Sequence, residues 1–132
     1  MKKRRRIKST YEALKRLPRL LGEIETLADA VIVEGSRDLE ALRHLGFRGV
    51  VILFSQVGVS DADFMDATSK GHGSVVILTD FDEEGLKIDR FLSDGLERRG
   101  VKVEKGLRHE MNRIMVTLRI SAIESLDNIH KK

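Results

Sequence analysis

The sequence predicts an α/β fold, in which a four-stranded parallel sheet carries helices on both faces and further helices lie at the two ends of the chain. Three observations predict this fold. Short apolar segments rich in Val and Ile recur four times, as the buried strands of parallel sheets do. Segments with helical spacing separate them, and glycines mark where elements end. Such strand–helix–strand units cross over in the right-handed sense and build a three-layer sandwich.

The four predicted strands share a short length and β-branched side chains. They span residues 30–35, 49–54, 74–79 and 100–106. Between them, Asp38 is placed to cap a helix that ends at Gly46, and Ser60 to cap one that ends at Gly71. A third helix follows the sequence DFDEEG and continues to about Arg99.

The segment before the first strand is predicted to be an amphipathic helix over residues 10–28. Its apolar side chains recur at helical spacing, at Tyr11, Leu14, Leu17, Leu21 and Ile24. Pro18 interrupts the pattern and either kinks the helix or begins a second short one. Ahead of this helix, residues 1–9 hold six Lys or Arg and no acid, which predicts a basic tail.

The last segment carries one continuous apolar stripe at spacings of three and four. Its members are Met111, Met115, Leu118, Ala122, Leu126 and Ile129. This predicts one unbroken helix that packs on the first helix or on the sheet, or forms the seam of a homodimer. A single domain is therefore predicted over residues 10–132, with its core at 29–105.

Length and composition limit the classes of protein to consider. A chain of 132 residues fits one domain, and the absence of cysteine excludes disulfides, thiolate zinc sites and cysteine nucleophiles. No apolar run reaches the ~18–20 residues that span a bilayer, and the basic start lacks the apolar stretch of a signal peptide. A cytoplasmic protein with no membrane partner is expected.

Charge is distributed unevenly, although the formal net charge is only +3. Residues 23–89 hold fourteen acids against five bases, whereas residues 1–8 and 90–132 carry an excess of bases. An acidic centre between basic ends repels a polyanion unless cations intervene, and a carboxylate-bound Mg²⁺ would resolve that conflict. The plainer interpretation, a charged surface with a basic tail, also fits this composition.

Acidic residues follow two of the predicted strands. Glu34-Gly35 ends the first strand, and the third continues into Asp80 and Asp82, which point to the same side if the chain stays extended. In an open parallel sheet, ligands bind beyond the carboxyl ends of the strands. If the first and third strands are neighbours, these three carboxylates lie together and repel one another, and a hard cation such as Mg²⁺ relieves the repulsion. Gly35 and Gly85 would let the backbone approach a phosphate.

A second interpretation of the same acids stays open. Acids at strand ends are often helix N-caps, and the acids at 82–84 would favour the helix dipole without binding any metal.

These residues resemble the Toprim domain, which topoisomerases of types IA and II, bacterial-type primases and several small nucleases share. The family pattern is an apolar strand ending in Glu-Gly with an Asp shortly after, then an apolar strand ending in Asp-x-Asp with a Gly following. The chain reads VIVEGSRD at 31–38 and VVILTDFDEEG at 75–85, so both halves are present in order. The resemblance covers roughly residues 29–105 and is closest to the short stand-alone archaeal and bacterial members.

The resemblance implies roles for individual residues. Glu34 corresponds to a glutamate that acts as general acid or base and also binds metal. Asp80 and Asp82 correspond to the Mg²⁺-binding pair, and Asp38 to an acid that caps a helix or supports the metal ligands. The Lys that often follows Glu-Gly in the family is replaced here by Ser36.

The implied function is Mg²⁺-dependent phosphodiester chemistry on RNA or DNA, with one or two Mg²⁺ ions that Mn²⁺ can replace; a small nuclease is favoured. The alternative is a noncatalytic nucleic-acid-binding module of a replication, repair or RNA-processing complex. A third interpretation is a structural domain whose acids only cap helices. A complete topoisomerase is not expected, because the single tyrosine, Tyr11, belongs to an apolar helical stripe.

Basic residues are expected to contact the phosphate backbone without reading sequence. They are Lys2, Lys3, Arg4, Arg5, Arg6, Arg37, Arg108 and Arg113. The loop at 55–60 follows the second strand and either frames the substrate or is a plain connection. His109, beside Arg108, either touches phosphate or lies in a solvated helix start, and His72 falls at the opposite edge of the sheet. The sequence carries no dinucleotide or P-loop motif.

Overall fold

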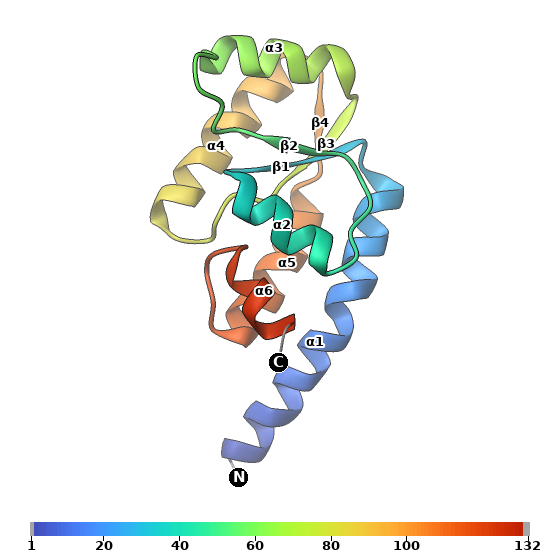
Figure 1. Ribbon diagram of the computed structural model, residues 1–132. Helices are drawn as coiled ribbons and strands as arrows, with labels where there is room; N and C mark the ends of the chain where they lie inside the picture. The colour runs from blue at the N-terminus through green and yellow to red at the C-terminus, as the bar shows by residue number, and fades with distance from the viewer. Residues whose placement is uncertain (1, 131–132) are drawn as a thin grey trace.

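The computed structural model describes residues 2–130 and shows a four-stranded parallel sheet between two layers of helices (Figure 1). The strands are β1 (Ala30–Val33), β2 (Val51–Leu53), β3 (Ser74–Ile77) and β4 (Lys102–Val103). Their order in the sheet is β2-β1-β3-β4, and all three neighbouring pairs are parallel. The predicted α/β fold class is confirmed, although each strand is shorter than its apolar segment.

The strand order places β1 at the centre of the sheet beside β3. Val31 pairs with Val76, and Ile32 pairs with Ile77, so the two strands end at the same level. The backbone continues this alignment one step further, because the N–H of Leu78 donates to the carbonyl of Ile32 at 2.7 Å. The residues that follow β1 and β3 therefore leave the sheet side by side.

Two apolar layers enclose the sheet, because alternate strand residues point to opposite faces. One face packs against α3 (Asp61–Gly71) and α4 (Glu83–Arg98). The other face packs against α1 (Lys2–Leu27), α2 (Ser36–His44), α5 (Lys105–Leu118) and α6 (Ser125–His130). In β1, Ile32 belongs to the first layer, whereas Val31 and Val33 belong to the second.

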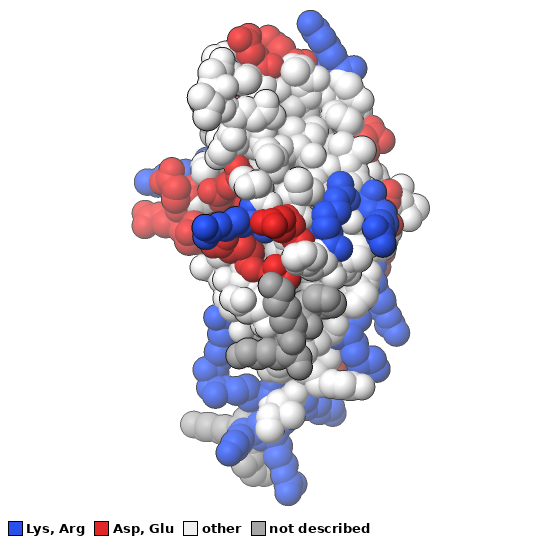
Figure 2. Space-filling view, viewed as in Figure 1, with Lys and Arg blue, Asp and Glu red and all other residues white. Residues whose placement is uncertain are grey.

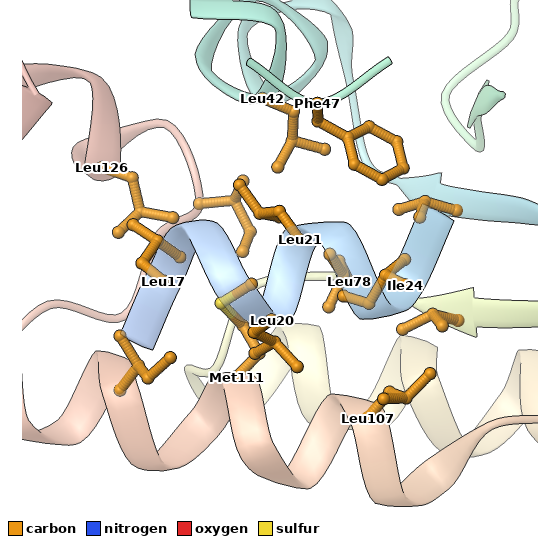
Figure 3. Packing of buried hydrophobic residues seen from close by; sticks show 14 of the residues in the cluster. Leu17, Leu20, Leu21, Ile24, Leu42, Phe47, Leu78, Leu107, Met111 and Leu126 are labelled. Atoms are coloured by element: carbon orange, nitrogen blue, oxygen red, sulfur yellow. The ribbon is translucent and has the colours of Figure 1, made fainter. Parts of the chain in front are cut away.

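The second layer is the larger, and α1 is its central helix. Figure 3 shows α1 between α5 on one side and the segment from Leu42 to Phe47 on the other. Leu21 and Ile24 of α1, and Met111 of α5, are at most 3% exposed. Truncation of any one of them to alanine would cost about 2–5 kcal/mol.

Helix α1 begins earlier than predicted. Residues 2–9, predicted as a basic tail, form its first turns, and the helix continues through Pro18 without a break. Pro18 is exposed, so the backbone carbonyl that it leaves without a hydrogen bond can be hydrated. The first buried residue of α1 is Ala13, and the turns before it extend beyond the domain (Figure 1).

The C-terminal segment is not one helix, and that prediction is wrong. Helix α5 ends at Leu118, where Arg119 takes a left-handed conformation with φ 60° and ψ 40°. The chain then runs without regular structure to α6 and buries Ile123 and Leu126 in the second layer. The apolar residues of this segment keep their spacing of three and four across the connection between the two helices. The sequence pattern therefore could not reveal the break.

None of the helices in residues 2–130 is long and apolar enough to cross a membrane.

Candidate functional site at the carboxyl edge of the sheet

The side chain of Glu34 lies against the backbone of Asp80, 46 residues away in the sequence. Glu34 Oε2 accepts a hydrogen bond from the Asp80 N–H at 2.8 Å. This contact follows from the parallel pairing of β1 and β3, which brings the residues after each strand to the same edge. The structure therefore brings together two of the three carboxylates that the sequence singles out.

The carboxylate of Asp80 is held by the C-terminal segment. Its Oδ1 accepts a hydrogen bond from the N–H of Ile123 at 3.0 Å. Next to it, the N–H of Phe81 donates to the carbonyl of Ser121 at 2.7 Å. The segment between α5 and α6, which the sequence predicts as helix, instead fixes Asp80 through these two bonds.

Asp82 has a different role from its neighbour in the motif. It is the N-cap of α4, where its Oδ1 accepts a hydrogen bond from the Gly85 N–H at 2.8 Å. Gly85 is required for close packing, because a Cβ built at this position would lie 1.9 Å from the carbonyl oxygen of Asp80. The backbone of Gly85 is therefore engaged by Asp82 and Asp80, which corrects the expectation that this glycine lets the backbone approach a phosphate.

Asp38 binds the start of α2 in the reverse arrangement, because Gly35 is the N-cap and Asp38 lies at the third position of the helix. Its Oδ2 accepts a hydrogen bond from the Gly35 N–H at 3.1 Å, so this N–H is also engaged. Burial, with Asp80, Glu34 and Glu124 nearby, raises the pKa of Asp38 to about 6, although the bond from Gly35 opposes the shift. Asp38 therefore takes part in the helix cap, but from the third position of α2 and not from the N-cap position that the sequence predicts.

The same forces act on Glu34 and Asp80. Burial raises the pKa of each carboxyl, the backbone bond that each accepts lowers it, and neighbouring acids raise it further. For Glu34 these acids are Asp80, Asp82 and Glu84; for Asp80 they are Asp82 and Glu124. The edge therefore holds negative charge that the fold itself leaves only partly compensated.

An open cleft of about 360 Å³ lies in front of these carboxylates. Its lining residues are Glu34, Gly35, Ser36, Arg37, Asp38, Ser55, Asp80 and Glu124. Acidic side chains gather in one patch of the surface, with basic side chains at its border (Figure 2). The loop after β2 reaches the cleft through Ser55, whereas Asp82 is not among the residues that line it.

Magnesium suits this donor set, although residues 2–130 contain no group of three His, Cys, Asp or Glu side chains arranged to hold one metal ion. Mg²⁺ takes one or two carboxylates and keeps several waters, so it does not need a closed protein cage. Glu34 and Asp80 supply two hard oxygen ligands in a cleft open to water. Their mutual repulsion is the condition that a divalent cation relieves.

Arg108 does not face the cleft, which corrects its prediction as a phosphate contact. It is 7% exposed and donates hydrogen bonds to the backbone at the end of β3. Its Nε forms an ion pair with Asp89 at 3.2 Å. The sequence could not reveal this role, because Arg108 pairs with Asp89, 19 residues away, and such a contact leaves no local sequence pattern.

The other predicted basic residues whose side chains the structure describes are exposed. Arg37 lines the cleft, and the side chain of Arg113 is 61% exposed beside Glu110. The N-terminal group is exposed on the first turns of α1; its members are Lys3, Arg4, Arg5 and Arg6. The side chain of Lys2 lies outside the described part of the chain. His109 is exposed in α5 and does not line the cleft.

Two residues of this region were missed. Glu124 lines the cleft from the C-terminal connection, and Asp89 neutralises the buried Arg108 from α4. Glu124 was hidden by the prediction of a continuous helix, which places it on a solvated face. Asp89 shows no signal in the sequence beyond its charge.

Comparisons with known proteins agree with this geometry. A family model described as "Toprim domain" matches residues 29–114. A UPF0292 protein of Thermococcus onnurineus is 36% identical over 92% of this chain and 88% of its own length. A UPF0292 protein of Methanocaldococcus jannaschii is 35% identical over 79% of this chain and 80% of its own length. A solved structure, titled a putative protein from Aquifex aeolicus, superposes with a TM-score of 0.66 at 25% identity, covering 81% of this chain and 94% of that one.

The family match supports a metal-dependent function related to nucleic acid. The match ends before the connection that carries Ile123 and Glu124, so this part of the cleft lies outside the matched region.

Proposed function

The chain belongs to the Toprim domain family and resembles its small archaeal UPF0292 members along most of its length; from this premise, we propose that it performs Mg²⁺-dependent phosphodiester hydrolysis on nucleic acid. One observation carries the proposal. Glu34 and Asp80, from the two halves of the motif, meet at the edge of an open cleft at the carboxyl ends of β1 and β3.

Glu34 and Asp80 would hold the Mg²⁺, or Mn²⁺ in its place. Asp82 is retained as a third candidate ligand, although its Oδ1 caps α4. A bound divalent ion would polarise a phosphate oxygen and offset the charge of the leaving group. Asp38 contributes by holding the start of α2, and with it the loop that carries Glu34 and Gly35.

Glu34 is the residue that we assign to proton transfer. Burial and nearby acids raise its pKa from the ordinary carboxyl value towards neutrality, which is the direction that a general acid or base requires. The N–H of Asp80 holds one oxygen of the carboxylate in place, and the side chain reaches the cleft. In this role it takes a proton from the attacking water or returns one to the leaving oxygen.

The basic residues supply affinity for the phosphate backbone. Arg37 borders the cleft, where it can contact a phosphate next to the reacting one. The exposed cations on the first turns of α1, together with Arg113, would bind phosphates further along the strand. Contacts of this kind do not read sequence, so RNA and DNA both remain substrates to test.

A second candidate function is a noncatalytic module that binds nucleic acid through Mg²⁺. The engagement of Asp82 as a helix cap favours it, because only Glu34 and Asp80 of the three motif carboxylates line the cleft. Such a module would keep the metal as a bridge to phosphate and would not cleave.

Incubation with labelled RNA and DNA, with and without Mg²⁺ or Mn²⁺, tests both candidates. Glu34→Gln is the variant, and Glu23→Gln, which changes an exposed acid of α1, is the matched control. Metal-dependent cleavage that only Glu34→Gln removes supports the nuclease. Metal-dependent binding without cleavage supports the module. Equal behaviour with and without metal in both assays contradicts both.

A further inference from the structure

We propose that Arg108 is a positioning residue, which fixes the carboxylate of Asp80 by binding the backbone on which it stands. The contacts of Arg108 supply the geometric argument. The consequence for metal binding rests on the proposed function. Arg108 is not itself part of the motif, since it lies on α5, 28 positions after Asp80.

The guanidinium of Arg108 binds three backbone carbonyls at the end of β3 and just after it. Nη1 donates to the carbonyls of Ile77 and Thr79, each at 2.9 Å, and lies 3.2 Å from the Thr79 hydroxyl. Nη2 donates to the carbonyl of Asp80 at 3.2 Å. These carbonyls lie where the hydrogen-bond ladder of β3 ends. Arg108 therefore donates the hydrogen bonds that a neighbouring strand would otherwise supply.

The buried charge is held in place on its other sides. Asp89 of α4 forms the ion pair at Nε, and the ring of Phe81 lies with its centroid 4.2 Å from the guanidinium carbon. A buried cation is costly unless it is paired and hydrogen-bonded, and here both conditions are met. The guanidinium is therefore restrained from α4, α5 and the strand end together.

Asp80 is consequently held by contacts from three elements. Arg108 fixes its backbone, and the N–H of Ile123 fixes its carboxylate at 3.0 Å. The first turn of α4 closes a third side, where Gly85 packs on the Asp80 carbonyl. Within this frame the remaining freedom of the carboxylate is small, which is the condition for a metal ligand with defined geometry.

Lysine cannot replace Arg108 in this arrangement. Its ammonium keeps the positive charge, yet it is a compact donor group on a flexible stem and lacks the planar fork that reaches several carbonyls and Asp89 at once. Arg108→Lys therefore keeps the charge beside Asp80 while it loosens the backbone. A purely structural role would lower the stability of the fold and leave the metal affinity of the folded protein unchanged.

The experiment measures Mn²⁺ affinity by electron paramagnetic resonance, on full-length protein at a temperature where circular dichroism shows each variant folded. The variants are Arg108→Lys and Asp89→Asn, and the control is Arg98→Lys, an exposed position of α4. We expect Mn²⁺ to bind roughly 10- to 100-fold more weakly to Arg108→Lys, as for other residues that support metal ligands, and unchanged to the control. Wild-type affinity in folded Arg108→Lys would overturn the inference.

Amide hydrogen exchange of Ile123 provides a readout without metal. If Arg108 positions Asp80, the Ile123 N–H exchanges faster in Arg108→Lys, while the amide of Leu92 in the other layer does not. Unchanged exchange at Ile123 also overturns the inference. Faster exchange in a protein whose wild type binds no Mn²⁺ would contradict the proposed function and leave the positioning of Asp80 established.

Discussion

The two halves of the acidic motif divide their carboxylates in the same way but differ in how tightly they are packed. After β1, Glu34 faces the cleft and Asp38, which also lines it, binds the N–H of Gly35 at the start of α2. After β3, Asp80 faces the cleft and Asp82 is the N-cap of α4. Asp38 is buried, whereas Asp82 is exposed. The glycines differ as well: Gly35 borders open space, and Gly85 touches the backbone of Asp80. The half that follows β3 therefore tolerates less change in its backbone. The half that follows β1 carries Asp38, whose pKa is raised to about 6.

Gly85→Ala should be the most damaging change in either half. The added methyl would lie 1.9 Å from the Asp80 carbonyl oxygen, so the first turn of α4 or the chain after β3 must move. Both are held, the latter by Arg108 and Ile123. We expect a loss of at least about 3 kcal/mol in the free energy of unfolding, measured by urea denaturation.

Gly35→Ala is the matched control in the other half. No heavy atom lies within 4 Å of its added Cβ, and the φ of −154° is open to any residue. Its cost should stay below about 1 kcal/mol, the usual difference between glycine and alanine at a helix N-cap. Similar costs for the two variants would show that the two halves are packed alike.

Much of this comparison follows from the sequence alone. The Val- and Ile-rich segments predict four parallel strands, and the rule for strand edges predicts that acids after β1 and β3 share an edge, if these strands are neighbours. The cap by Ser60 is predicted and present, and Asp38 binds the start of α2 as predicted, although from the third helical position, with Gly35 as the N-cap. These features depend on residue types and short spacings, which a single sequence contains.

The features that were not predicted depend on contacts between distant segments. An arginine on the ligand edge has the same local sequence whether it faces solvent or, like Arg108, binds the carbonyls of a strand end. The break at Arg119 has no glycine or proline to mark it, and the apolar spacing continues across it. The start of α1 carries the charges of a tail, with cations at the end where the helix dipole disfavours them. Packing from Ala13 onwards fixes the helix from which these turns extend.

Asp38→Asn should change how stability depends on pH. Burial raises the pKa of Asp38 from 3.8 in the unfolded chain to about 6 in the fold, so between these values the folded state holds a proton that the unfolded state has lost. Wild-type stability should therefore fall as the pH rises from about 4 to about 6, by about 2–3 kcal/mol from this group. Asparagine keeps an oxygen for the Gly35 N–H and cannot ionise, so the variant should lack this part of the decline.

Urea denaturation of wild type and Asp38→Asn across pH 3–8 isolates the effect, because the neighbouring carboxyls of Glu34 and Asp80 are present in both proteins. The difference between the two curves should grow in favour of the variant through the window and then stay constant. A constant difference over the whole range would mean that Asp38 titrates as it does in the unfolded chain, and that its burial carries no electrostatic cost.

Asp82→Ala should have a smaller effect. Removal of the side chain leaves the Gly85 N–H without its acceptor, but the exposed position lets water replace it. The cost should be about 1 kcal/mol in the free energy of unfolding, as for other N-caps, with Ser60→Ala at the start of α3 as the comparison. If Asp82 is also a ligand, Asp82→Ala will additionally weaken Mn²⁺ binding, which Ser60→Ala will not.

Glu34→Gln should have the smallest effect on stability, and the opposite sign. The amide oxygen can still accept from the Asp80 N–H, and the variant removes the repulsion between Glu34 and the acids around it. Because burial and those acids raise the folded pKa of Glu34, the ionised side chain opposes folding, so without metal the variant should be slightly more stable than wild type. Mg²⁺ should reverse the order, since a ligand that binds only the folded wild type raises its unfolding midpoint. Thermal unfolding in a chelator and then in excess Mg²⁺ measures both effects. An equal rise in both proteins would remove Glu34 from the metal site and leave Asp80 as the main ligand of the ion in the cleft.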